Sequence, residues 1–395
     1  MNATSAIPAF YLFAASRELI PIYPPYAVMF LAEGITAVGL ASLIAIWSSV
    51  VLLAEVPSGA LADRTSRKRL VLVGMWMKAA AFLIWYVWRD YWGFAAGFVC
   101  WGLGSSLRSG AQEALMYEMM QGFGREADFP RFYGVFSSLT MLSSSAGQLA
   151  GGMLIFLGYD TVLLISAVMP IVSTIPIMIF VAEPARRASP DQRNDYWATL
   201  ASGVRVARDD RRVVYILLVS MIVLVVPGIF DEFASPTFAE AGFSLEYLGY
   251  FGALNGIAAA AGMAVSHRLR ATDHVTLLCL AAFAGVVLAC ATFGLNVWLV
   301  AGIAVFFFLF AIVSTSLQVQ LQTLIDSETR ATVASVVALG EEAGGIIFIM
   351  AFGFIAGGAG MIGAMRFAGV GTVITASAFI VLARVWQLRL QAQDG

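Results

Sequence analysis

The sequence has 395 residues, of which 60% are hydrophobic and only 12% are charged, and its formal net charge is −2. A soluble core cannot hide this much apolar surface, since soluble domains are about half apolar and a quarter charged. The composition therefore predicts a polytopic membrane protein, and the near-neutral charge gives no argument for a nucleic-acid partner.

Twelve apolar runs follow one another along the chain, each close to the roughly 20 residues that a helix needs to cross a bilayer. They lie at 6–31, 38–60, 70–88, 92–118, 132–157, 161–182, 213–239, 244–266, 274–294, 296–319, 331–356 and 361–386. One long polar gap, 183–212, separates the first six from the last six. The expected fold is all-α and integral to the membrane. Its twelve transmembrane helices form two pseudo-symmetric six-helix bundles, 1–182 and 213–395, joined by a cytoplasmic linker, 183–212.

The distribution of cations predicts the orientation of these helices. If the N-terminus is cytoplasmic, the cytoplasmic connections and the C-terminus hold eighteen of the 23 Lys and Arg residues. The opposite face holds only Arg89 and Arg366. Positive residues collect on the cytoplasmic side of membrane proteins, so both termini are expected to lie in the cytoplasm.

The two halves of the sequence are weakly similar to each other. Gly34 and Gly39 precede the second span, and Gly242 and Gly249 precede the eighth. A charged connection follows the second span, and a weaker copy, GMAVSHRLR, follows the eighth. Two six-span repeats are typical of a transporter that rocks around a central site.

A dense charged knot connects the second and third spans. It reads GALADRTSRK from Gly59 to Lys68, followed by Arg69. This stretch resembles the loop signature of the major facilitator superfamily, G-x-L-A-D-R-x-G-R-K, in which only the second Gly differs, being Ser66 here. Ser would cost roughly 1 kcal/mol at that position if its backbone had to be left-handed. The resemblance covers essentially the whole chain and implies the twelve-helix fold and transport by alternating access.

The resemblance also implies that the knot acts as a gating latch. Asp63 is expected beside the N-terminus of the eleventh helix, near Arg330, where the helix dipole stabilises a carboxylate. Arg67 is expected to reach Glu118 at the cytoplasmic end of the fourth helix. The gating residues are then Gly59, Asp63, Arg64, Arg67, Lys68, Glu118 and Arg330. The alternative for the cations is simple anchoring near anionic lipid, worth about 1 kcal/mol each.

Further stretches are similar to a bacterial small-molecule and drug-efflux-like branch of the family, at 108–118, 231–233 and 326–336. In the fifth helix the spacing of an antiporter signature, G-x8-G-x3-G-P-x2-G-G, is matched by Gly134, Gly147, Gly151 and Gly152. Ser143 replaces one Gly of that signature and Gln148 replaces its Pro, which weakens the argument for export. Close packing of helices through small residues explains the same glycines and is compatible with the motif.

Ionisable residues lie at membrane depth, although each costs roughly 2.5–3.5 kcal/mol at the bilayer centre. The predicted proton or substrate pathway comprises Arg17, Glu18, Arg108, Glu113, Asp231, Glu232, Glu341 and Glu342. By resemblance, the four helices that carry them border or approach the central cavity. Neighbouring residues point about 100° apart, so at most one of each acidic pair needs to face it and the others can form salt bridges. Lys78 can snorkel or pair with another acid.

No motif indicates a cofactor or an enzyme. The three cysteines, in separate apolar runs, predict neither a disulfide framework nor a metal site. The sequence contains no Walker-type G-x4-G-K-[ST] and no H-E-x-x-H, and nothing suggests a nucleophile with a paired base. Energy for transport is therefore expected to come from a gradient or from partners.

The sequence is thus interpreted as a carrier of the cytoplasmic membrane, expected to act as a monomer. Its partners are a small organic substrate, protons and the lipid bilayer. Export is favoured, and uptake of a metabolite or metal chelate by the same fold is the alternative. A more remote alternative is a non-transporting membrane sensor, which would have no need of a gating latch.

Overall fold

The computed structural model describes residues 3–182, 214–215, 218–219, 225–266, 268, 273–294, 296–324 and 330–391. These residues are helical apart from short connections, and no strand occurs among them. Within this part of the chain, eight helices are long and apolar enough to cross a membrane. Each of the twelve predicted spans contains helix in the described residues, although the seventh, 213–239, is described as a long helix only from Val225. The predicted all-α membrane fold is therefore confirmed.

The chain divides into two compact units. Unit 1 comprises Met1–Gln192 together with Ser244–Ala253, and unit 2 comprises Arg193–Phe243 together with Leu254–Gly395. The predicted linker, 183–212, lies outside the described residues, so the boundaries set on either side of it stay a prediction.

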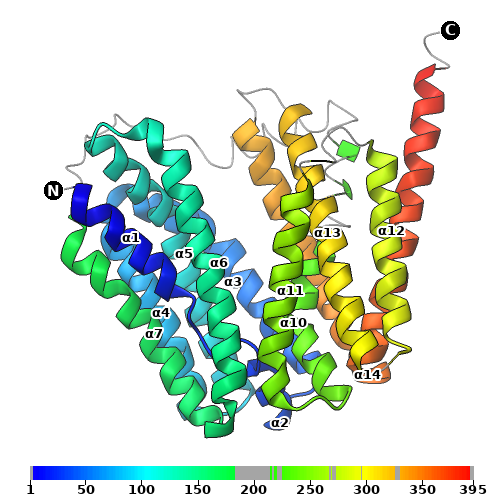
Figure 1. Cartoon of the computed structure of the whole chain (residues 1–395), viewed down its shortest axis with the longest axis horizontal. Helices are drawn as coiled ribbons and strands as arrows, with labels where there is room; N and C mark the ends of the chain where they lie inside the picture. The colour runs from blue at the N-terminus through cyan, green and yellow to red at the C-terminus, as the bar shows by residue number, and fades with distance from the viewer. Residues whose placement is uncertain are drawn as a thin grey trace. The chain divides into compact units, whose positions relative to one another are not determined.

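Unit 1 contains the helices of the first half of the chain. They are α1 (Ala3–Arg17), α2 (Tyr26–Ala32), α3 (Ala37–Arg64), α4 (Arg67–Val87), α5 (Tyr91–Gly122), α6 (Phe129–Leu154) and α7 (Tyr159–Phe180). Helix α5 packs against α3 and α4, while α1 packs against α6 and α7 (Figure 1). Buried aromatic rings join α1 to α6, where the Phe10 and Phe132 ring centroids lie 5.9 Å apart. This apolar packing holds α1 at the centre of the site described below.

Unit 2 contains most of the second half. Its helices are α10 (Val225–Glu240), α12 (His274–Ala291), α13 (Val297–Leu324) and α14 (Arg330–Gln391). Helix α11 (Leu245–Ser266) belongs to unit 2 from Leu254 onward, and its start belongs to unit 1. Helix α14 is interrupted at Gly360, whose φ of +74° is non-helical, so it provides two spans rather than one. The Glu240 carboxylate accepts hydrogen bonds from the Met361 and Ile362 N–H groups, at 2.6 and 3.2 Å. It thereby satisfies amide groups that begin the last helix.

The two halves share one turn in detail, which supports the internal repeat. Before α3, the Ile35 N–H donates to the Phe30 carbonyl (3.0 Å), and before α11 the Phe243 N–H donates to the Phe238 carbonyl (3.1 Å). Gly34 and Gly242 occupy the same place in these turns, each with φ of +88°. A residue with a side chain is strained at such a φ, so both turns favour glycine.

Candidate functional site

The first predicted span, 6–31, is not one continuous helix. Helix α1 ends at Arg17 and α2 begins only at Tyr26, and irregular backbone lies between them. Pro21, Pro24 and Pro25 fall in this break, and proline removes a backbone N–H and disfavours a helical residue before it. Irregular backbone at membrane depth occurs only where protein or a water-filled cavity surrounds it, so the break is a candidate site.

Two buried serines satisfy amide groups of the break. The Glu18 N–H donates to Ser143 Oγ of α6 (3.2 Å), and the Ile22 N–H donates to Ser166 Oγ of α7 (2.9 Å). Both serines are at most 3% exposed. At Ser143, the departure from the glycine of the antiporter-like motif therefore supplies a hydrogen-bond acceptor to the broken helix.

The glycines of α6 let the broken segment approach closely. A Cβ at Gly147 would lie 2.6 Å from the Ile20 nitrogen, and one at Gly151 would collide with the Pro21 carbonyl oxygen. In contrast, a Cβ at Gly134 would meet nothing within 4 Å. Close packing is thus a sufficient reason for Gly147 and Gly151, whereas no described contact requires Gly134.

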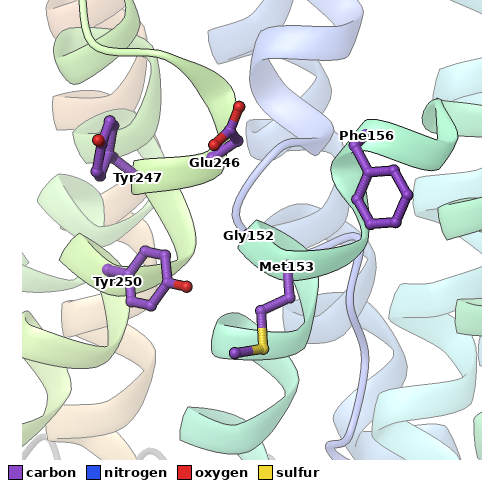
Figure 2. A pocket seen from close by; sticks show the side chains of 6 residues that line it. All are labelled: Gly152, Met153, Phe156, Glu246, Tyr247 and Tyr250. Carbon is purple, nitrogen blue, oxygen red and sulfur yellow. The ribbon is translucent and has the colours of Figure 1, made fainter.

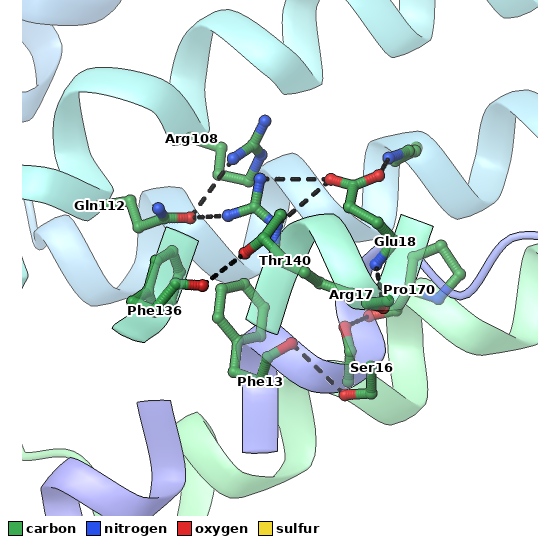
Figure 3. A network of polar contacts seen from close by, with 12 residues as sticks. Phe13, Ser16, Arg17, Glu18, Arg108, Gln112, Phe136, Thr140 and Pro170 are labelled. Atoms are coloured by element: carbon green, nitrogen blue, oxygen red, sulfur yellow. Dashed lines mark hydrogen bonds and ion pairs between the residues drawn. The ribbon is translucent and has the colours of Figure 1, made fainter. Parts of the chain in front are cut away.

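The Glu18 carboxylate lies at the break and is surrounded by donors (Figure 3). Its Oε1 accepts from Nε and Nη2 of Arg17, both at 3.2 Å. Its Oε2 accepts from Lys78 Nζ of α4 at 2.7 Å and from the Tyr23 hydroxyl at 2.8 Å. The side chains of Arg17, Lys78 and Glu18 are only 8%, 6% and 14% exposed. The contacts identify the partner of Lys78 as Glu18, which the sequence left open.

A third cation, Arg108 of α5, lies beside this group. Its Nη1 donates to Gln112 Oε1 at 3.3 Å, and Arg17 Nη1 donates to the same oxygen at 2.5 Å. Figure 3 shows the two guanidinium groups side by side, with Gln112 on one side of them and Glu18 on the other. Three cations therefore converge on one carboxylate and one neutral amide.

Aromatic rings surround two of these cations. Lys78 Nζ lies 5.2 Å from the Tyr23 ring centroid and 5.5 Å from that of Trp101, and these two rings stack at 5.7 Å. The Arg17 guanidinium lies 5.6 Å from the Phe13 ring. Cation–π contacts of this kind are worth about 0.5–2 kcal/mol each. They lower the cost of keeping these cations away from water.

Glu113, also predicted to belong to the pathway, is placed differently. Its carboxylate accepts from the Tyr133 hydroxyl of α6 at 2.6 Å and its side chain is exposed. None of the ion pairs among the described residues joins Glu113 to Arg17, Lys78 or Arg108. The structure thus brings Arg17, Glu18 and Arg108 together and leaves Glu113 outside their group.

In the charged knot, Arg67 forms an ion pair with Glu118 of α5. Lys68 Nζ donates to the carbonyl oxygens of Met178 and Val181, at 2.9 and 2.6 Å, at the C-terminal end of α7. A cation at this position satisfies orphan carbonyls and complements the helix dipole. Arg64 is the last residue of α3 and is exposed, as is Gly59. The side chains of Asp63 and Arg330 lie outside the described residues, so their part of the latch stays a prediction.

Ser66, the departure from the loop signature, carries no backbone strain. Its φ is −65°, in the region that any residue adopts, rather than left-handed. Its hydroxyl accepts a hydrogen bond from the Arg69 N–H at 3.1 Å and so caps the start of α4. The cost considered for a left-handed Ser does not arise here.

The predicted acids of unit 2 lie on two helices. Asp231 and Glu232 are in α10, and Glu341 and Glu342 are in α14. Asp231 is exposed and Glu341 is half-buried. Among the described residues, no Lys, Arg or His forms an ion pair with Asp231 or Glu341.

A separate hollow of about 700 Å³ lies within unit 1, between the end of α6 and the start of α11. Gly152, Met153 and Phe156 line one side, and Glu246, Tyr247 and Tyr250 line the other (Figure 2). A Cβ at Gly152 would collide with the Glu246 carbonyl oxygen, so this glycine permits close contact between the two helices. The hollow contains none of the charged residues at the break.

Sequence reasoning missed four polar residues of the site: Tyr23, Gln112, Ser143 and Ser166. Tyr, Gln and Ser within apolar runs are common, and their partners lie up to 144 positions away in the sequence. The one signal that pointed to the break is the Pro21, Pro24 and Pro25 cluster within a predicted span. No group of His, Cys, Asp and Glu in the described part of the chain is arranged to hold a metal ion.

The chain is similar to known membrane transporters in sequence family and in fold. Residues 6–349 match the family described as Major Facilitator Superfamily. A mutant of the nucleoside transporter NupG is similar over 95% of this chain and 98% of its own, with a TM-score of 0.80 and 14% identity. The POT family transporter PepTSo is similar over 98% of this chain and 99% of its own, with a TM-score of 0.72 and 13% sequence identity.

The fold is also similar to that of a bacterial homolog of the human lysosomal transporter Spinster, with a TM-score of 0.72 and 14% sequence identity. That structure is in an inward-facing and unoccupied conformation. The similarity covers 96% of this chain and 95% of the Spinster homolog. At such identities these likenesses concern the fold alone. No curated protein sequence matches this chain.

Proposed function

Because the chain belongs to the major facilitator superfamily, we propose that it is a proton-coupled carrier that exports a small organic molecule across the cytoplasmic membrane. Membership in the family makes it a secondary transporter of a small molecule and not an enzyme. The proton coupling, the direction and the particular membrane are the proposed parts. Alternating access of a central site is the mechanism by which such a carrier works.

The observation that supports proton coupling is that Asp231 and Glu341 form no ion pair with any described cation. Both lie at membrane depth in the predicted seventh and eleventh spans, and neither has a cation partner among the described residues. Desolvation favours the protonated form of such a carboxyl group, whereas contact with water favours ionisation. A group whose surroundings alternate between these two conditions can take up a proton on one side and release it on the other.

Export is the proposed direction, supported by the antiporter-like glycine spacing of α6. Uptake is a second candidate, and one observation favours it. Gln148 replaces the Pro of the export-associated motif, and α6 remains helical from Phe129 to Leu154. A Cβ at Gly252 would collide with the Gln148 side-chain oxygen, so Gln148 is placed in helix packing rather than at a kink.

The knot is proposed to close the cytoplasmic gate. The Arg67–Glu118 ion pair supports its attachment to α5, and Asp63 is proposed to complete the latch at the start of the eleventh helix. Asp63→Asn should then leave expression intact while greatly slowing transport and favouring the inward-open state. Labelling of cysteines placed on the cytoplasmic side of the cavity measures this, and flux at the rate of the unsubstituted chain would contradict the latch.

The test of coupling and direction uses the purified chain in proteoliposomes that contain a pH-sensitive dye. A panel of organic acids, amines and nucleosides is applied under an inward and then an outward proton gradient. Export by antiport predicts proton entry that accompanies exit of one panel compound. Proton movement in the same direction as the compound indicates uptake by symport. Flux without any proton movement would overturn the proposed coupling.

A further inference from the structure

The charges at the break of the first helix do not balance. Arg17, Lys78 and Arg108 contribute three positive charges, and Glu18 is the one carboxylate that the described contacts place among them. Each buried cation is costly at membrane depth, at roughly 2.5–3.5 kcal/mol on insertion scales. Two surplus cations at this depth favour the binding of an anion beside them.

Glu18 has no capacity left for the third cation. Each of its two oxygens already accepts two hydrogen bonds, from Arg17 on one side and from Lys78 and Tyr23 on the other. An ionised carboxylate offers about four lone-pair sites in total. Glu18 therefore has no acceptor site left for a hydrogen bond from Arg108, and its single charge is already shared by Arg17 and Lys78.

Among the described residues, Arg108 is the cation of this group that forms no ion pair. Its one side-chain hydrogen bond among the described residues is to the neutral Gln112 oxygen, which it shares with Arg17. A guanidinium carries five N–H donors, so most of the Arg108 donors have no described acceptor. The side chain is half-buried, and in Figure 3 its far end points away from the network.

Aromatic rings lie next to Lys78, another cation of this group. Trp101, in helix α5, stacks on Tyr23 at 5.7 Å and is close to Trp47 at 6.0 Å. The Trp47 Nε1–H is buried without a hydrogen-bond partner in the described part of the chain. All three rings are half-buried, so they offer apolar surface and one further donor beside the cations.

We propose that Arg108, together with Arg17 and Lys78, binds the carboxylate group of the transported molecule, and that the substrate is an organic anion with an apolar or aromatic body. Planar bidentate pairing is the preferred contact between a guanidinium and a carboxylate. Gln112 holds Arg17 and Arg108 together and so fixes the geometry of the site. The inference rests on the proposed function only in taking the bound molecule to be the transported one.

The test measures binding to the full chain in detergent, without any gradient. The probes are benzoate, 4-hydroxybenzoate, indole-3-acetate and succinate, each beside its neutral amide. We expect at least one carboxylate to raise the melting temperature and to give a measurable Kd, while its amide does not. If no carboxylate stabilises the protein, or if the amides stabilise it equally, the proposal is wrong.

The variants locate the effect. Arg108→Gln should weaken the Kd of the carboxylate by about tenfold or more, the size expected for a lost hydrogen bond to a charged group. Arg108→Lys keeps the charge and should recover part of the affinity. Arg125→Gln is the control, because it removes an equal charge from an exposed residue that pairs with Asp128. Equal weakening by Arg108→Gln and Arg125→Gln would contradict a local site.

The outcome is separable from that of the proposed function. Carboxylate binding that depends on Arg108, without proton-coupled flux, supports the anion site and contradicts the coupling. Proton-coupled flux of an amine or a nucleoside, without carboxylate binding, supports the coupling and contradicts the anion site.

Discussion

Unit 1 and unit 2 carry opposite kinds of charge at membrane depth. In unit 1, three cations gather around Glu18 at the break between α1 and α2. In unit 2, Asp231 of α10 and Glu341 of α14 have no ion-pair partner among the described residues. The turns at Gly34 and Gly242 are alike, so the halves share a backbone plan while their polar chemistry differs.

This difference teaches that the internal repeat specifies the fold and not the function. A repeated turn needs only a glycine at the same place, whereas each charged group depends on the particular neighbours that surround it. We interpret the cation-rich half as the part that holds the substrate and the acid-bearing half as the part that exchanges the proton.

The largest effect is expected for Glu18→Gln. The change leaves Arg17, Lys78 and Arg108 close together without their carboxylate, and the first two are buried. Removing one partner of a buried ion pair costs about 3–5 kcal/mol, so the purified protein should melt much lower and lose transport. Thermal unfolding followed by intrinsic fluorescence measures the change.

The control for Glu18→Gln is Glu113→Gln, which removes an exposed carboxylate that accepts only from Tyr133 in the described contacts. It should have a small effect on melting. Adding Lys78→Met to Glu18→Gln should recover part of the loss, because one buried cation is removed with the acid. If Glu18→Gln melts like the unsubstituted chain, the network does not stabilise unit 1.

The second prediction concerns the acids of unit 2. Asp231→Asn and Glu341→Gln should leave the melting temperature nearly unchanged, since neither acid has a described ion-pair partner to lose. At least one of them should abolish flux driven by a pH gradient while substrate binding is retained. Proteoliposome flux and equilibrium binding are measured on the same preparations.

Glu232→Gln and Glu342→Gln complete the second experiment, because only one acid of each adjacent pair needs to face the cavity. If all four variants keep the pH dependence of the unsubstituted chain, the acids are structural. The proposal that the acids of unit 2 exchange the proton would then be wrong.

The third prediction concerns the ion pair between Arg67 and Glu118, at the end of unit 1 that is remote from the break. Both side chains are partly exposed, so the pair should contribute no more than about 1 kcal/mol to stability. A double-mutant cycle with Arg67→Gln and Glu118→Gln measures the coupling. If the pair is part of a latch, Arg67→Gln and Glu118→Gln should also reduce the transport rate, and by more than a loss of about 1 kcal/mol in stability explains.

The smallest effect is expected at Ser66. Ser66→Gly should change the free energy of unfolding by only a few tenths of a kcal/mol, whereas Ser66→Ala should cost about 1 kcal/mol through the lost cap of α4. Thermal or denaturant unfolding of the two variants gives the comparison. A clear stabilisation by Ser66→Gly would indicate that the backbone at Ser66 is strained after all.

The fold and the residues that are costly to bury can be predicted from the order of the amino acids. Apolar runs of about 20 residues can satisfy their backbone only as helices in a bilayer, so hydropathy predicted the twelve spans and their helical state. The knot signature predicted the family. The resemblance also implied that Arg67 reaches Glu118, and the structure contains this ion pair.

Which polar groups meet depends on how the helices pack against one another. The break after Arg17 depends on Ser143 and Ser166, which lie more than a hundred residues away and accept hydrogen bonds from the Glu18 and Ile22 N–H groups. The grouping of Lys78 and Arg108 with Glu18 depends on how α4 and α5 pack against the break. Charge balance is a property of neighbours in space, so the surplus of cations in unit 1 could not be read from a chain whose total charge is nearly zero.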